Sequence, residues 1–336
     1  MELATSYMGL RLRNPLVASA SPLSYTLDGI RRLARAGVGA IVLFSLFEEQ
    51  LREEAIRRAL IVDSTAESFP EALDYLPTIA EDEAGPSRYV SLLKRASAEV
   101  DIPVIASLNC VTPEGWADYA GVVQDAGAAA IELNVYYLPG DPEIAGVDVE
   151  QRHVDIVERV KSAVTVPVAV KLSPYFSSFG EVALRLDEAG ADALVLFNRF
   201  LYPDVDSETL AISPNVTLSS PAEARLPRTW IALLHGRTRA ALAATTGVED
   251  SADVAGYLLA GADVVMTASA LLRHGPEYAG DLLDGLSAWM DRNGLRSVDE
   301  LRGMLSAPAT TDRAAYERAG YVSAMRAANS GADAPR

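Results

Sequence analysis

A lysine at the end of a short apolar run is the side chain best suited to chemistry in this sequence. Lys171 follows the apolar residues 168–170, which have the composition of a buried strand. A cation in such a place loses hydration and needs an anionic partner. It could compensate negative charge on a cofactor ring, form a Schiff base, or pair with a carboxylate such as Glu132. The residues alone leave these three roles open.

Two asparagines and a cysteine also stand at the ends of apolar runs. Asn134 and Asn198 can each donate and accept hydrogen bonds, which suits the amide-like edge of a heterocycle. A buried asparagine satisfied within the protein is the alternative at both positions. Cys110 has no histidine near it in the order of the runs, so we interpret it as a small buried residue rather than a nucleophile.

Small and hydroxyl residues after the last two apolar runs indicate a phosphate site. Such residues let backbone N–H groups approach an anion, and the loops after the last two strands of barrel enzymes often hold phosphate. Ordinary turn and capping chemistry is the alternative. The residues concerned are Thr245, Thr246, Gly247, Ala268 and Ser269.

These residues must be positioned by an element that the sequence repeats four times. In each copy a helical pattern ends in Ala-Gly, and a short apolar run follows within a few residues. Glycine at a helix C-terminus takes the left-handed conformation that ends the helix, and such runs are typical of parallel strands covered on both faces. The four runs begin at residues 41, 131, 194 and 264.

Four further runs complete a predicted set of eight strands, and helical patterns separate them. Three of these runs carry proline near the strand start, where its missing N–H does no harm. We therefore predict an α/β protein, a (β/α)₈ TIM barrel over residues 1–305. A doubly wound open sheet is less suitable, because no Gly-x-Gly-x-x-Gly turn follows any strand. The further runs span 14–19, 102–107, 166–171 and 240–245, and the helical patterns 28–37, 87–100, 114–127, 151–164, 179–190, 226–236, 251–261 and 276–291.

Two segments lie outside the repeat. Residues 46–86 form an insertion after the second strand, expected to act as a lid because such insertions lie on the catalytic face of a barrel. It is expected to begin with an amphipathic helix whose i,i+4 pairs, such as Glu48 and Arg52, form a solvated face. Residues 306–336 are expected to hold one helix, at 314–327, and a disordered tail.

Composition excludes several classes of function. The net charge of -17 repels nucleic-acid phosphates and anionic membranes, and no stretch approaches the ~20 apolar residues that span a bilayer. The single cysteine excludes intrachain disulfides and a cysteine-ligated iron–sulfur cluster, and the histidines lack zinc-binding spacing. We interpret all three histidines as structural or surface residues. We expect a cytoplasmic protein without a secretory signal that acts on a small molecule and holds no metal.

The motifs of this chain occur in the order found in class 1 dihydroorotate dehydrogenases, and the sequence resembles that family from about residue 7 to 305. The most specific motif is Val-Lys-Leu-Ser-Pro-Tyr-Phe at 170–176; others are Asn-Pro at 14–15, Glu-Leu-Asn at 132–134 and Thr-Gly-Val-Glu at 246–249. The resemblance implies an FMN-containing barrel, commonly a homodimer, that oxidises dihydroorotate to orotate in pyrimidine biosynthesis.

Carried over by position, the resemblance implies a role for each residue of the site. Lys171 would lie near the N1–C2=O edge of the flavin, where negative charge builds on reduction. Asn198 would lie where substrate and flavin meet. The other flavin contacts would come from Ala18, Ser19, Ala20, Ser107 and Asn134. The phosphate would be held by Thr245, Thr246, Gly247, Ala268 and Ser269.

The chain departs from the family on the substrate side. The family's loop after the fourth strand reads Asn-Leu-Ser-Cys-Pro-Asn, or has serine for cysteine, whereas residues 134–139 read Asn-Val-Tyr-Tyr-Leu-Pro. Tyr137 thus replaces the catalytic base; a phenol with a pKa near ~10 is a poor base but can serve as an acid. A family lysine is replaced by Phe44 or Ser45, and no asparagine-rich loop that grips orotate is recognisable in 46–86.

The leading hypothesis is an FMN-dependent dehydrogenase with a changed substrate. In it Tyr137 is the candidate acid/base, and Lys171 stabilises the reduced flavin. Two alternatives remain: a lyase or aldolase that forms a Schiff base on Lys171, and a barrel that binds flavin but has lost catalysis.

Overall fold

The computed structural model describes residues 1–50, 85–110, 113–200, 203–213 and 217–307, and a few helical residues between 318 and 326. Eight parallel strands close into a barrel, which confirms the predicted TIM-barrel fold. Each predicted strand coincides with one barrel strand. In barrel order they are β11 (Ala241–Ala244), β12 (Val264–Thr267), β3 (Leu16–Ala18), β4 (Ala40–Phe47), β5 (Val104–Asn109), β6 (Ala130–Asn134), β7 (Val168–Leu172) and β8 (Ala193–Leu196).

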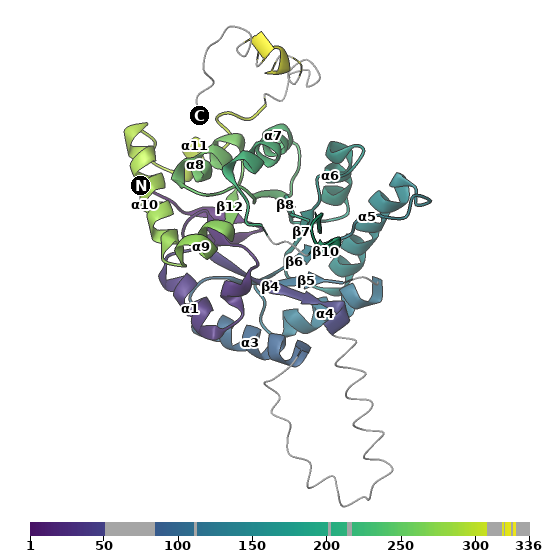
Figure 1. Cartoon of the computed structure of the whole chain (residues 1–336). Coiled ribbons are helices and arrows are strands. Elements are labelled where there is room, and N and C mark those ends of the chain that lie inside the picture. The colour runs from purple at the N-terminus through teal and green to yellow at the C-terminus, as the bar shows by residue number, and fades with distance from the viewer. Residues whose placement is uncertain are drawn as a thin grey trace, which may run out of the picture.

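Helices ring the barrel on the outside (Figure 1). Each of the eight predicted helical ranges overlaps one of them: α1 (Leu27–Arg35), α3 (Gly85–Glu99), α4 (Pro113–Asp125), α5 (Gly146–Ala163), α6 (Phe179–Glu188), α7 (Arg225–Leu234), α8 (Ser251–Ala260) and α10 (Tyr278–Arg292). The short elements were not predicted: the hairpins β1 (Thr5–Tyr7) with β2 (Leu10–Leu12) and β9 (Asp204–Asp206) with β10 (Ala211–Ser213), and η1 (Pro22–Ser24), η3 (Pro221–Ala224), α9 (Ser269–His274) and α11 (Val298–Leu301).

Two apolar cores follow from the alternation of side chains along each strand. The larger core fills the layer between strands and helices, and the smaller one fills the barrel interior, where alanine and valine predominate. Tyr7, Met8 and Leu12 of the β1–β2 hairpin belong to the interior core. The hairpin therefore plugs the end of the barrel at which the strands begin, and leaves the other end for a site.

The repeated Ala-Gly-Ala-Asp pattern has a second structural use. Gly261 ends α8 with a left-handed φ of 118°. Two residues later, Asp263 Oδ2 accepts a hydrogen bond from the backbone N–H of Leu242 at 2.8 Å. In the preceding copy, Asp192 Oδ2 accepts from the N–H of Val168 at 2.7 Å. Each aspartate thus ties the start of its own strand to that of the preceding barrel strand, which is also its neighbour in the barrel.

The boundary of the expected insertion differs from the prediction. β4 continues to Phe47, so the strand passes the expected start of the insertion at residue 46. The expectation of a solvated Glu48 is wrong, because this residue directly follows the long strand and is only 4% exposed. Residues 51–84, with Arg52 and most of the expected lid, lie outside the described residues, as do 308–317 and 327–336. The lid and the C-terminal tail stay predictions.

Candidate functional site

A chain of hydrogen bonds links side chains at the carboxyl ends of the strands. The hydroxyls of Ser107 on β5 and Ser45 on β4 lie 2.9 Å apart. Asn134 Nδ2 on β6 donates to Ser45 Oγ at 3.1 Å, and Asn198 Nδ2 donates to Asn134 Oδ1 at 2.5 Å. The structure thus brings together three predicted residues and adds Ser45, which the sequence marked only as the place of a missing lysine.

Tyr89 on α3 fixes the Ser107 end of this series of hydrogen bonds. Its hydroxyl accepts a hydrogen bond from the Ser107 N–H at 2.8 Å and donates to the Ser107 carbonyl at 3.3 Å. Burial raises the pKa of Tyr89, so the phenol stays neutral. The fixed backbone of Ser107 keeps its hydroxyl directed towards Ser45.

Lys171 on β7 pairs with the carboxylate of Glu132, which was one of the three roles predicted for it. Its Nζ lies 3.7 Å from Oε1 of Glu132 on β6, a separation that makes an ion pair but not a short hydrogen bond. Both side chains are buried, Lys171 at 8% and Glu132 at 0% exposure. Burial raises the pKa of Glu132, and the charge of Lys171 opposes that shift. The pairing leaves Lys171 donors for a further acceptor, so it does not exclude a cofactor role.

A cavity of about 190 Å³ lies beside Lys171 at the carboxyl end of the barrel. Ala18, Ser107 and Asn134 do not line this cavity. Asn134 nevertheless accepts a hydrogen bond from Asn198, which does line it. The predicted residues that line the cavity are Ser19, Ala20, Lys171, Asn198, Thr245, Thr246, Gly247, Ala268 and Ser269. Residues not predicted to line it are Ser21, Pro22, Phe197, Arg199, Leu218, Ser219, Val248, Met266, Thr267 and Leu272.

The part of the cavity that is lined by the residues latest in the sequence consists of hydroxyl side chains and a glycine. Ser219 Oγ lies 2.9 Å from Ser269 Oγ and accepts a hydrogen bond from the Gly247 N–H at 3.2 Å. Gly247 has a φ of 73°, and a Cβ there would lie 2.6 Å from the Ala224 backbone nitrogen. Ser219 lies in the connection between β8 and α7, outside any repeat, so the sequence carried no signal for it.

Two arginines, each paired with a glutamate, lie at or near this part of the cavity. Arg199, which lines it, pairs through Nε with Glu223 at 2.9 Å. Arg273 at the end of α9 donates to the Ser219 carbonyl at 2.6 Å and pairs with Glu249. Both guanidinium groups are about one-third exposed, and Arg199 is the one whose side chain lines the cavity.

The ring face of Tyr137, the candidate acid/base, is covered by an arginine side chain. The Arg152 guanidinium carbon on α5 lies 4.5 Å from the Tyr137 ring centroid, and the ring packs against the layer between strands and helices. A tight turn precedes it, in which the Tyr136 N–H donates to the Asn134 carbonyl at 2.8 Å. The two adjacent tyrosines therefore occupy different surroundings.

Tyr136 joins an aromatic cluster above three neighbouring strand ends. Its ring meets Phe200 edge-on at 4.5 Å, and Phe200 stacks with Tyr175 at 5.9 Å between centroids. The members follow β6, β8 and β7, the strands that carry or precede Asn134, Asn198 and Lys171. Tyr136 and Tyr175 remain 39% and 59% exposed. A partly exposed aromatic cluster thus lies at the ends of the strands that carry or precede Asn134, Lys171 and Asn198.

Cys110 and the histidines have the structural roles predicted for them. Cys110 is buried, and burial raises the pKa of its thiol to about 12, which removes it as a nucleophile at neutral pH. His153 Nδ1 lies 2.7 Å from the Val149 carbonyl, and His235 Nδ1 lies 3.1 Å from that of Gly261. His274 Nε2 lies 2.8 Å from Glu249 at the surface.

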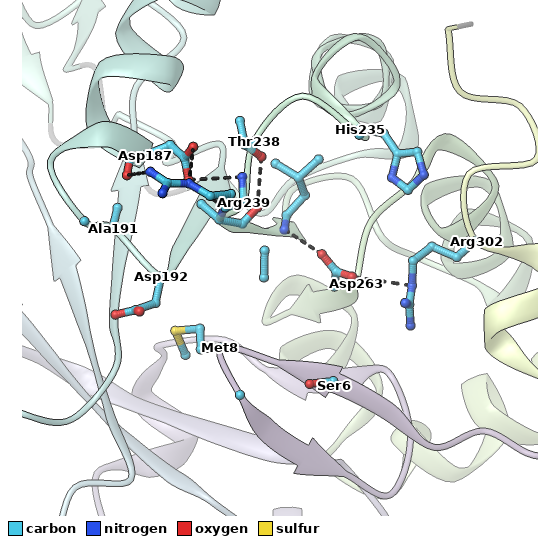
Figure 2. A pocket seen from close by; sticks show the side chains of 16 residues that line it. Ser6, Met8, Asp187, Ala191, Asp192, His235, Thr238, Arg239, Asp263 and Arg302 are labelled. Carbon is cyan, nitrogen blue, oxygen red and sulfur yellow. Dashed lines mark hydrogen bonds and ion pairs between the residues drawn. The ribbon is translucent and has the colours of Figure 1, made fainter. Parts of the chain in front are cut away.

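A larger cavity, of about 710 Å³, lies at the opposite end of the barrel (Figure 2). Its acidic side chains already serve the fold: Asp187 accepts from the N–H of Ala240 at 2.8 Å, and Asp263 from that of Leu242. Polar groups at this end of a TIM barrel serve stability, whereas catalysis takes place at the carboxyl end of the strands. The smaller cavity beside Lys171 is therefore the candidate site.

Comparison with known proteins finds relatives among the dihydroorotate dehydrogenases. The family model described as dihydroorotate dehydrogenase matches residues 65–290. The catalytic subunit of dihydroorotate dehydrogenase B (NAD(+)) from Methanothermobacter thermautotrophicus is 30% identical over 311 residues, covering 90% of this chain and 98% of the relative. A protein of Aeropyrum pernix, provisionally described as dihydroorotate dehydrogenase A (fumarate), is 28% identical, covering 90% of this chain and 97% of the relative.

Proposed function

This chain belongs to the dihydroorotate dehydrogenase family, FMN-dependent dehydrogenases that act on CH–CH groups, and on that premise we propose that it binds FMN in the cavity beside Lys171. The observation that carries the proposal is the continuity of the site. A buried cation and a hydrogen-bonded polar chain lie at one side of the cavity, and a hydroxyl and glycine cradle lies at the other. FMN, when bound, supplies the acceptor for two electrons.

The polar chain and Lys171 suit the ring of the cofactor. Lys171 would donate to the ring edge where negative charge develops, and its buried ammonium would stabilise that charge. Asn134 and Asn198 can meet further donors and acceptors of the ring, since each amide has hydrogen-bonding capacity beyond their mutual bond. Ser19 and Ala20 line the cavity and would approach the ring through their backbone, whereas Ser107 and Ala18 lie behind this lining and would support it.

The hydroxyl and glycine cradle suits the phosphate. Gly247 lets the chain pass Ala224 closely, where any side chain would collide. Thr245, Thr246, Ala268 and Ser269 offer small side chains and backbone around the same space, and Ser219 adds a hydroxyl. Arg199 and Arg273 offset the phosphate charge in a chain whose net charge is -17.

The aromatic cluster supports a substrate other than dihydroorotate. Tyr136 and Tyr137 stand where the family has serine and its catalytic base, and Tyr136 contributes to an exposed stack with Phe200 and Tyr175. Such a surface favours a substrate with a planar or apolar part over a small, highly polar acid. We include oxidation of dihydroorotate, in pyrimidine biosynthesis, as the activity to test first.

Either tyrosine can supply the acid/base. Tyr137 is the residue that the family motif designates, and its ring lies beside the Arg152 cation. Tyr136 lies among the aromatic residues that border the substrate space. Tyr137→Phe should slow flavin reduction strongly if its hydroxyl transfers the proton, and Tyr136→Phe serves as the paired variant. A rate unchanged in Tyr137→Phe and lowered in Tyr136→Phe would move the role to Tyr136.

An anaerobic absorption spectrum before and after addition of dihydroorotate tests the function. A flavin spectrum that bleaches supports both cofactor and substrate. A flavin spectrum that stays oxidised keeps the cofactor and directs the search to donors with a planar apolar part. No flavin band after incubation with FMN would overturn the proposal and favour a lyase that forms a Schiff base on Lys171.

Assembly and location complete the proposal. A homodimer follows from the family resemblance, and a cytoplasmic location agrees with the single, unpaired Cys110. None of the described helices is long and apolar enough to cross a membrane. Light scattering of the purified protein would show a mass twice that of the 35.8 kDa chain if the dimer forms.

A further inference from the structure

Glu132 is a buried acid that the proposed reaction does not use. Its side chain is fully buried inside the barrel, beneath the cavity, and neither carboxyl oxygen has a hydrogen-bond partner among the described residues. Leaving both oxygens of a buried carboxylate without hydrogen bonds is costly, and protonation removes most of that cost. The position therefore suits a group that changes its charge.

The surroundings of Glu132 contain one cation and two neutral phenols. Lys171 on β7 lies 3.7 Å away. Across β5 the residue in register is Ser107, and across β7 it is Ala169. Tyr7 of the β1–β2 hairpin and Tyr89 on α3 are the titratable groups that feel the charge of Glu132: burial raises the pKa of both, and this charge adds to the rise.

Tyr7 offers a second unsatisfied group in the same interior. Its hydroxyl is fully buried and has no hydrogen-bond partner among the described residues. Unsatisfied polar groups that share a barrel interior are the usual setting of buried water. Such water would hydrate either charge state of Glu132.

We propose that Glu132 takes up one proton when negative charge forms beside Lys171, so that the barrel interior couples protonation to reduction of the bound cofactor. One cation serves two anionic partners here: Lys171 balances Glu132 when the ring is neutral, and the ring when it carries charge. The second negative charge is then neutralised by protonation. The O–H bond forms on a Glu132 carboxylate oxygen, and the proton comes from solvent. The two electrons pass from the substrate of the proposed reaction to FMN.

This inference rests on the proposed FMN site, and the pH dependence of the midpoint potential tests it. Each proton taken up changes the ratio of reduced to oxidised cofactor tenfold per pH unit, which is about 30 mV for a two-electron couple. Spectroelectrochemical titration of the FMN-loaded protein is made at several pH values for the wild type and Glu132→Gln. In the variant, the slope of midpoint potential against pH should be smaller by about 30 mV per pH unit, the contribution of one proton. Its potential should also rise at the alkaline end, where the wild-type carboxylate is charged.

Glu150→Gln is the matched control. Glu150 is also a buried acid, but it lies on α5 and accepts a hydrogen bond from Ser177 at 2.9 Å. Its substitution should leave the slope unchanged. A wild-type slope in Glu132→Gln would overturn the inference while leaving the FMN site intact, and failure to bind FMN would overturn both.

Infrared spectroscopy gives a second test that needs no folded variant. The difference spectrum of the wild-type protein, reduced minus oxidised, should contain a new protonated-carboxyl band that shifts in D₂O. Where Glu132→Gln folds, the band should be absent from its spectrum. A wild-type difference spectrum without such a band contradicts proton uptake by Glu132.

Discussion

Single residues decide which charges and shapes the candidate site accepts. Lys171 is the buried cation that lines the cavity, and Gly247 is the residue at which any side chain would meet the Ala224 backbone. Both were predicted from residue type at a strand end. Ser45 and Ser219 were not, since a serine in a sequence has no property that separates a site residue from a surface one until tertiary contacts bring partners to it.

Gly247→Ala should weaken FMN binding. The substitution places a Cβ 2.6 Å from the Ala224 nitrogen in a left-handed conformation that costs about 1–3 kcal/mol for other residues. A loss of about 1.4 kcal/mol corresponds to tenfold weaker binding, which a fluorescence titration with FMN measures. Gly121→Ala is the control, since no atom lies within 4 Å of a Cβ at that helical position. Equal affinities in the two variants would contradict the cradle.

Glu132 should give the stability of the cofactor-free protein a specific pH dependence. Burial raises its pKa in the folded state, so the native protein binds more protons than the unfolded chain. Its contribution to the free energy of unfolding should therefore fall as pH rises above the ordinary glutamate pKa of about 4.3. Urea unfolding at several pH values should show that Glu132→Gln gains stability relative to the wild type as pH increases. A difference that stays constant with pH would disprove the shift.

At the scale of elements, periodicity and helix-ending glycines predicted all eight strands and their helices, because each element has to bury an apolar face. The hairpins and the end of β4 were not predictable in this way. β4 continues through Leu46 and Phe47 because Phe47 pairs with Asn109 of β5, and residues 48–50, where the charge pattern begins, are helical as predicted. Tertiary pairing thus decides where the strand ends.

Asp192→Ala should destabilise the barrel at the start of β7. Asp192 Oδ2 accepts from the buried Val168 N–H at 2.7 Å and from Lys161 Nζ at 2.6 Å. Loss of the carboxylate leaves the N–H unsatisfied, which costs about 1–3 kcal/mol in the free energy of unfolding. Denaturant unfolding measures this cost. Asp118→Ala, at an exposed position of α4, should stay within about 0.5 kcal/mol of the wild type.

The whole molecule separates stability from chemistry along the barrel axis. The β1–β2 hairpin and the strand-tying aspartates occupy one end, and the polar chain, Lys171 and the cradle occupy the other. The net charge of -17 opposes the approach of the proposed anionic cofactor, so its binding would depend on cations close to the site. Closure of the barrel brings Lys171, Arg199 and Arg273 to that end from separate parts of the chain.

Thermal stabilisation by FMN should exceed that by riboflavin, which lacks the phosphate. A ligand bound only by the folded state stabilises it by about 2.7 kcal/mol at a concentration 100 times its Kd, so the weaker ligand gives the smaller rise in Tm at equal concentration. Arg199→Gln should narrow the difference, because Arg199 lines the cavity and faces the proposed phosphate end. Glu208→Gln, on the exposed turn between β9 and β10, is the control for surface charge and should keep the difference. Equal Tm shifts from FMN and riboflavin in the wild type would mean that the cradle around Gly247 does not hold a phosphate, and that the cavity binds the flavin ring alone.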